Sequence, residues 1–210
     1  MTEYDYEMPP LTPPTGGYSV AMSGLEPADI IVSTTDTIVS GLIRFGTRSV
    51  VSHAILYVGG GTVVEAVRKG VVKRSLVDAL SDANLAVAYR CPVLTQRERK
   101  KIVTWAVSQA RKGLKYSMGK ISFLSDPTIR HLCGVVSAVQ TEFICSELVI
   151  AAYEQAGVPL TTQPSACVSP EGVLQIAKER LVYVGHLRGD LLKRPRPQGD
   201  RQWHLGRYGE

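Results

Sequence analysis

Cys145 stands where a cysteine could serve as a nucleophile. It opens the run CSELVIAAYEQA, in which apolar residues recur at helical spacing before Gly157, a typical helix stop. A helix N-terminus lowers the pKa of a thiol, because unpaired backbone N–H groups and the helix dipole favour the thiolate. The same amide groups could hold the oxyanion of an acyl-transfer reaction. The alternative is a small buried residue at the edge of an apolar helix face, since free cysteine is among the most buried residue types.

A cysteine nucleophile also needs a base, and the base needs a group that orients it. His53 begins the predicted strand in SHAILYV, which is a rigid mount for a side chain. His131 lies in a segment without a clear pattern, and neither His186 nor His204 has a distinguishing context. His53 is therefore the candidate base, and an ordinary polar residue at a strand end is the alternative.

The acidic partner of His53 depends on the register of a predicted hairpin. A glycine triplet, 59–61, joins the β-rich runs 52–58 and 62–67. With a three-residue loop, Glu65 falls on the same face as His53, displaced diagonally by one pair and within reach of it. A carboxylate there would hold the imidazole in the productive tautomer. A two-residue loop would place Glu65 on the opposite face, where it would be an exposed edge-strand charge.

Two further residues are candidates for binding the oxyanion or the substrate. Tyr57 shares the predicted face of His53 and could donate a hydrogen bond, although a packed core tyrosine is the alternative. Ser146 would contribute from the helix start. Zinc could in principle use His53, Glu65 and Cys145, but neither HExxH nor CxxC spacing supports a metal site. We therefore expect neither a metal nor a cofactor.

The elements that must position these residues predict an α+β fold, with helices flanking a central antiparallel sheet. The predicted strands cover residues 28–34, 52–58, 62–67, 70–76, 85–93 and 181–187. A helix is predicted over 35–46, another from Thr95 with Glu98 completing a capping box, another from Cys145, and another from Ser169 with Pro170 at its first position. Residues 114–140 predict one or two short helices and a loop.

Composition predicts one globular domain with two tails. The 210 residues are 44% apolar, enough for a single packed core. Residues 1–26 are rich in proline and glycine and predict a flexible lead-in, 27–187 form the domain, and 188–210 form a basic tail. The net charge of +5 is mild and gathers in that tail, which we interpret as solvated; we do not expect a nucleic-acid partner.

The sequence shows no targeting or membrane-spanning pattern. The N-terminal residues are acidic and proline-rich and do not form a secretory signal, and no apolar run approaches the roughly 20 residues of a membrane span. Cys91, Cys133, Cys145 and Cys167 show no CxxC pairing. We therefore expect synthesis in the cytoplasm with free thiols.

Two motifs in this order are fairly specific: SHAILYVGGGTVVEA, within ADIIVSTTDTIVSGLIRFGTRSVVSHAILYVGGGTVVEAV, and FICSELVIAAYEQAG. Together they resemble the circularly permuted NlpC-type papain-like cysteine peptidases, the YiiX-like proteins, which are distantly related to lecithin–retinol acyltransferase. The resemblance covers about residues 27–187, and Ala28 departs from it where glycine is usual. It implies a permuted papain-like fold with Cys145 as nucleophile, His53 as general base and Glu65 as the residue that orients the histidine.

The sequence thus predicts a thiol hydrolase that works through an acyl-enzyme. The resemblance leaves two substrate classes open: cell-wall peptide amides, typical of NlpC-type enzymes, and lipid esters, typical of acyltransferase relatives. A binding module that keeps the fold without turnover is the non-enzyme alternative. The small size and missing signal peptide also suggest the hypothesis of an antibacterial toxin-like effector, exported by a dedicated secretion system and neutralised by an immunity protein.

Overall fold

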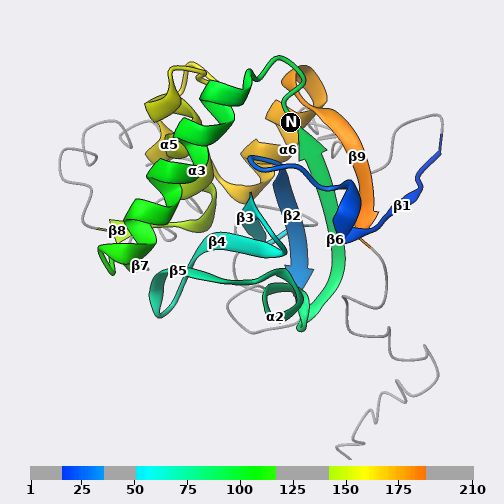
Figure 1. Cartoon of the computed structure of the whole chain (residues 1–210), viewed down its shortest axis with the longest axis horizontal. Helices are drawn as coiled ribbons and strands as arrows, with labels where there is room; N and C mark the ends of the chain where they lie inside the picture. Colours follow the sequence, from blue (N-terminus) through cyan, green and yellow to red (C-terminus); the bar gives the residue numbers. More distant parts are fainter. Residues whose placement is uncertain (1–15, 36–50, 117–141, 188–210) are drawn as a thin grey trace, which may run out of the picture.

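The computed structural model describes residues 16–35, 51–116 and 142–187. These residues form a seven-stranded sheet and the helices packed on it (Figure 1). The strands of this sheet are β1 (Ser19–Val20), β2 (Ile30–Thr35), β3 (His53–Gly59), β4 (Thr62–Val67), β5 (Gly70–Ser75), β6 (Ala83–Arg90) and β9 (Val182–Leu187). Their order is β1-β9-β6-β2-β3-β4-β5. All neighbouring pairs are antiparallel except β1–β9. The predicted α+β fold with a central, mostly antiparallel sheet is confirmed.

Helices pack on this sheet from both sides. They are α2 (Leu76–Leu80), α3 (Gln96–Arg111), α5 (Cys145–Ala156) and α6 (Pro170–Arg180), with 3-10 turns at Met22–Gly24 and Ser165–Cys167. A short parallel pair, β7 (Lys115–Tyr116) and β8 (Glu142–Phe143), precedes α5. The sequence prediction lacks α2, because five residues are too few to show a helical period. Only its cap marks it: the Ser75 hydroxyl accepts the N–H of Asp78 at 3.0 Å.

Alternate residues of the strands enter two separate cores. On one face α3, α5 and α6 pack over the sheet, with α3 beside α5 (Figure 1). The strand residues in that core include Ile30, Val32, Ala54 and Leu56. The opposite face packs against α2 with Ile31, Ile55 and Val63. Because both faces are covered, the central strands are almost continuously apolar in sequence.

The predicted helix boundaries are confirmed where caps define them. Thr95 and Glu98 form the capping box at the start of α3: the Thr95 hydroxyl accepts the Glu98 N–H at 3.3 Å, and the Glu98 carboxylate accepts the Thr95 N–H at 2.8 Å. Ser169 caps α6 by accepting the Gly172 N–H at 3.1 Å. Gly157 ends α5 with φ 85°, a left-handed conformation that favours glycine.

Thr95→Ala is expected to lower the free energy of unfolding by about 1 kcal/mol, because the substitution leaves an N-terminal N–H of α3 without its side-chain acceptor. Urea denaturation followed by circular dichroism measures the change. Gln96→Ala is the matched control, since Gln96 is exposed on the same turn and alanine favours the helix. Equal unfolding free energies for the two variants would show that the cap contributes nothing.

The segment expected to be a flexible lead-in is partly structured, which corrects that prediction. β1 pairs with β9, and the rings of Tyr18 and Tyr183 meet edge to face with centroids 5.2 Å apart. Short strands of two residues carry too little pattern to be recognised from sequence. The helix predicted in 35–46, most of 114–140 and the basic tail 188–210 lie outside the described residues.

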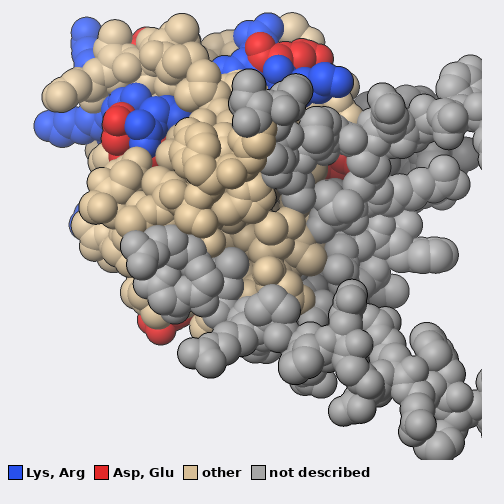
Figure 2. Space-filling view, turned by 90° about the vertical axis from the view of Figure 1, so that its right-hand side faces the viewer, with Lys and Arg blue, Asp and Glu red and all other residues tan. Residues whose placement is uncertain are grey.

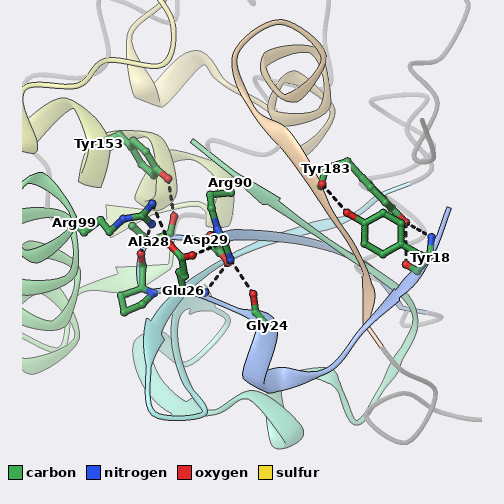
Figure 3. Close-up of polar contacts among 10 residues, drawn as sticks. Tyr18, Gly24, Glu26, Ala28, Asp29, Arg90, Arg99, Tyr153 and Tyr183 are labelled. Carbon is green, nitrogen blue, oxygen red and sulfur yellow. Dashed lines mark hydrogen bonds and ion pairs between the residues drawn. The ribbon is translucent and has the colours of Figure 1, made fainter. Parts of the chain in front are cut away.

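A network of ion pairs and hydrogen bonds holds the entry to β2 (Figure 3). The buried carboxylate of Asp29 accepts two hydrogen bonds from Arg90, from Nε at 2.8 Å and from Nη2 at 2.7 Å. Arg90 also donates to Glu26 at 2.6 Å and to the carbonyl of Gly24 at 2.9 Å. Arg99 joins the network through Glu26 at 3.1 Å. These contacts tie α3 and β6 to the segment that leads into β2.

Ala28, within this segment, has a left-handed backbone with φ 75°. An L-residue with a Cβ costs about 1–2 kcal/mol in that conformation, and glycine avoids the cost. In this chain, buried hydrogen bonds hold the alanine: its N–H donates to Tyr57 O at 2.8 Å, and its carbonyl accepts the Tyr153 hydroxyl at 2.6 Å (Figure 3).

The surface shown in Figure 2 carries charges of both signs. Its visible Lys and Arg side chains lie mainly along the upper part, beside Asp and Glu, and uncharged residues cover the middle. Among the helices in the described part of the chain, none has both the length and the apolar character of a membrane span.

Candidate active site

The β3–β4 hairpin determines where Glu65 lies relative to His53. The three glycines of its turn all have positive φ, at 93°, 59° and 68°, so the sharp turn depends on glycine. The paired residues are Leu56 with Val64, Tyr57 with Val63 and, after a bulge, Gly59 with Thr62. The first two pairs have the register of the three-residue loop. Continued along the strands, this register places Glu65 and His53 on one face.

The side chains of His53 and Glu65 meet as that register requires. His53 Nε2 lies 2.5 Å from Glu65 Oε2. The second carboxylate oxygen, Oε1, accepts a hydrogen bond from Nε of Arg74 on β5. Glu65 is fully buried, whereas the side chains of His53 and Arg74 are 17% and 39% exposed. Both oxygens of the buried carboxylate are therefore satisfied by nitrogen donors, one from each neighbouring strand.

Cys145 is the first residue of α5 and lies against the start of β3. Its thiol is hydrogen-bonded to the His53 side chain and accepts the backbone N–H groups of Ala54 and Ser146. Because Nε2 of His53 faces Glu65, Nδ1 is the ring nitrogen that remains for the thiol. The structure thus brings Cys145, His53 and Glu65 together in one hydrogen-bonded chain.

The local sequence at the start of α5 explains this placement. Ile144 is extended, with φ −95° and ψ 164°, and the Glu147 carboxylate reaches back to accept its N–H at 3.3 Å. An acidic residue in the first turn also interacts favourably with the helix dipole. The chain therefore turns into the helix at Cys145, a residue only 1% exposed beside the first amide groups of the helix.

The electrostatics of the site favour a thiolate–imidazolium pair. Burial alone would raise the pKa of the Cys145 thiol, but the charge and hydrogen bond of His53 and the two backbone N–H groups lower it below its ordinary value. Burial alone would lower the pKa of His53, but Cys145 and then Glu65 raise it to about 10. Burial would likewise raise the pKa of Glu65, and His53 followed by Arg74 lowers it. All three groups are therefore stabilised in their charged forms.

The structure places the two further candidates for oxyanion binding, Tyr57 and Ser146, at different distances from the thiol. The Tyr57 hydroxyl accepts the N–H of Gly61 at 3.0 Å, at the turn end of the hairpin. Four residues of strand, about 13 Å, separate this position from His53. The Ser146 hydroxyl donates to the carbonyl of Val168 at 2.5 Å and is fully buried. Only the backbone N–H of Ser146 reaches the sulfur.

Sequence reasoning missed two residues at the site. Tyr116 pairs with Phe143 across β7 and β8, two residues before Cys145. Burial raises the pKa of Tyr116, and the nearby charge of Cys145 raises it further, so its hydroxyl stays protonated beside the thiolate. No pattern in its segment pointed to this. Arg74 could have been found from the β4–β5 pairing, which places it on the face of Glu65.

The side chains at this site do not fit a metal ion. Within the ranges that the structure describes, no three His, Cys, Asp or Glu side chains lie close enough to hold one. The Glu65 carboxylate is already shared between His53 and a guanidinium, whose positive charge opposes a second cation there. We therefore derive no step through a metal.

A separate hollow of about 490 Å³ lies at the other end of β3. It is lined by Glu26, Pro27, Val58, Gln96, Arg99, Lys100 and Val103. Ser33 pairs with His53 and Ile30 with Leu56, so the entry to β2 and this hollow lie away from the cysteine. None of its lining residues belongs to the hydrogen-bonded chain of Cys145.

The chain is similar to proteins that are already known, although no family model matches it. It is 27% identical over 196 residues to the Escherichia coli K12 protein named "Probable lipoprotein peptidase YaeF", covering 78% of this chain and 71% of that protein. The crystal structure of the metalloprotein YiiX (DUF1105) from Escherichia coli O157:H7 has a TM-score of 0.51 at 21% identity, covering 75% and 88% of the two chains. The second match shows a shared fold, and both are consistent with the resemblance to YiiX-like proteins.

Proposed function

We propose that this chain is a peptidase-like thiol hydrolase on a permuted NlpC-type papain-like fold. The observation that carries the proposal is the contact between Cys145, at the first residue of α5, and His53, whose other ring nitrogen faces Glu65. The order of the histidine strand before the cysteine helix supports the permuted fold. Similarity to a protein named as a peptidase supports a peptidase-like hydrolase.

In the first half of the reaction, the Cys145 thiolate attacks the carbonyl carbon of the substrate. The carbonyl π electrons move to oxygen, and backbone N–H groups at the start of α5 stabilise this oxyanion. His53 donates its Nδ1 proton to the leaving amine as the carbon–nitrogen bond breaks. The products of this half are a thioester on Cys145, a free amine and a neutral imidazole.

In the second half, water hydrolyses the thioester. His53 accepts a proton from the water while the hydroxide equivalent attacks the thioester carbonyl. The carbon–sulfur bond breaks, the acid product leaves, and Cys145 departs as the thiolate beside an imidazolium. Glu65 holds Nε2 in both halves, so the ring keeps Nδ1 toward the sulfur. Because the His53 pKa is raised to about 10, the protonated acid persists through neutral pH.

Selective labelling of Cys145 tests the nucleophile. At mildly acidic pH, iodoacetamide is expected to label Cys145 faster than Cys91 or Cys167, because the imidazolium of His53 stabilises the Cys145 thiolate. His53→Ala is expected to slow this labelling at least about tenfold, since it removes the charge that lowers the thiol pKa. Mass spectrometry of the peptides measures each site. Equal labelling of the three cysteines would contradict the proposal and favour a binding module.

Product analysis decides the substrate class. Wild type and Cys145→Ala are incubated with peptidoglycan fragments and, separately, with phospholipids, and the products are compared by mass spectrometry. We expect new amine and carboxyl ends in the peptidoglycan fragments with the wild type only. Cys145-dependent release of fatty acid instead would assign the lipid-ester alternative. The aliphatic segment IVSGLIRF, which would suit a lipid or a packed core equally well, lies outside the described residues.

A further inference from the structure

We propose that Arg74 is a positioning residue that keeps Glu65 ionised and aimed at His53. Through Glu65, it sustains the ion pair between His53 and Cys145. This inference rests on the proposed thiol chemistry and extends its hydrogen-bonded chain by one residue, from the buried sulfur to a side chain that reaches solvent.

The pairing of β4 with β5 places Arg74 at this position. Glu65 pairs with Val72 and Val63 with Arg74, and residues directly opposite each other share a face of the sheet. Arg74 and Glu65 therefore lie diagonally on one face, and Nε of Arg74 donates to Oε1. His53 takes the other oxygen, Oε2, at 2.5 Å. The carboxylate is bridged between the two donors, so it cannot rotate without breaking one contact.

The burial of Glu65 explains why this bridge matters. A carboxylate with no exposed surface tends to take up a proton unless nearby positive charge and hydrogen bonds hold it ionised. The described groups that face it are His53 from β3 and Arg74 from β5, while Cys145 and Tyr116 approach the chain from the far side of the histidine. His53 gives up its proton during turnover, whereas the guanidinium of Arg74 takes no part in the proton transfers.

Loss of Arg74 would act on the cysteine by two steps. First, Glu65 would bind a proton at a higher pH and would lose the donor that fixes its rotation. Second, a neutral or misdirected carboxyl would balance the imidazolium less well, so the pKa of His53 would fall and that of Cys145 would rise. Because the Arg74 side chain is 39% exposed, water screens its charge and reduces the effect of removing it. The expected shift at the thiol is therefore about one pH unit, at the lower end of the usual range.

The pH dependence of Cys145 alkylation by iodoacetamide tests this inference without any substrate. In Arg74→Met the midpoint pH of the labelling rate is expected to be about one pH unit higher than in wild type. At a pH below the midpoints of both proteins, the variant is expected to be labelled about tenfold more slowly. Arg74→Lys keeps a positive charge on the same face. Its midpoint is therefore expected to lie close to that of wild type. Lys73→Met is the matched control, because Lys73 is exposed next to Arg74 but pairs with Val64 and so faces the other way. It should titrate like wild type.

A double-mutant cycle separates the proposed action from general disturbance of the site. Glu65→Gln carries no charge to hold, so adding Arg74→Met to it is expected to give no further change in the midpoint. Thermal unfolding of each variant checks the fold, and Arg74→Gln replaces Arg74→Met if that variant does not fold. An unchanged midpoint in a folded neutral variant, or an equal shift when Glu65→Gln is already present, overturns the inference.

The two proposals can fail separately. If Arg74→Met shifts the midpoint but Cys145→Ala hydrolyses substrate as well as wild type, the proposed function is wrong and the positioning role stands. If hydrolysis depends on Cys145 but the midpoint does not change when Arg74 is replaced, the positioning role is wrong and the proposed function stands.

Discussion

Cys145→Ser is expected to lower the rate of hydrolysis by about 10⁴-fold or more. The serine hydroxyl has a far higher pKa than a thiol, so the imidazolium of His53 cannot hold it as an anion. The backbone N–H groups and the histidine remain, but they have no nucleophile to support. Single-turnover kinetics on the substrate identified by product analysis measure the loss.

Cys167→Ser is the control for this prediction, since Cys167 lies in the 3-10 turn before α6 and does not belong to the hydrogen-bonded chain of Cys145, His53 and Glu65. It should retain wild-type turnover and wild-type unfolding. Turnover by Cys145→Ser within about tenfold of wild type would exclude acyl transfer through this sulfur. Full activity with a labelled, blocked Cys145 would do the same.

Arg90→Met is expected to lower the free energy of unfolding by about 3–5 kcal/mol, because it leaves a buried charge without its partner. Asp29 is fully buried and accepts two hydrogen bonds from Arg90. Without them, its carboxylate keeps a backbone N–H from Glu26 at 2.8 Å but has no neutralising partner there. Urea denaturation, monitored by circular dichroism, measures the change.

Two controls accompany this measurement. Arg97→Met removes an exposed arginine from α3 and is expected to change unfolding by no more than about 0.5 kcal/mol. Asp29→Asn with Arg90→Met is expected to lose less than the sum of the single changes, because the amide leaves no buried charge. A loss below about 1 kcal/mol for Arg90→Met would mean that solvent already compensates Asp29.

The sequence alone was sufficient for most of the central architecture, because its signals are local. Alternating or continuous apolar runs marked the main strands, and the Thr95 and Ser169 caps and the Gly157 stop marked three helix ends that the structure confirms. It missed β1 and α2, which are too short to show a period. It also treated as a flexible lead-in a segment that pairs with the last strand of the sheet.

The proximity of His53 and Glu65 followed from the alternation of side chains between the two faces of one hairpin. The sequence could therefore predict it once the loop length was assumed. The structure supplies the register, with a bulge next to the glycine turn. Tyr57 lies on the same face as His53 but too far along the strand, where its hydroxyl accepts the N–H of Gly61. The alternation of side chains predicts which face of a strand a residue occupies. Whether two residues on that face can touch depends on how far apart they lie along the strand.

By itself, the sequence determined the chemical types at the site and their local settings: a thiol at a helix start, an imidazole at a strand start and a carboxylate in the next strand. Only the tertiary structure decided that the helix start abuts β3, that Arg74 completes the contacts of Glu65 and that Tyr116 lies beside Cys145. The physical reason is that caps and periods act over a few residues, whereas these contacts join segments whose separation is set by sheet pairing and helix packing.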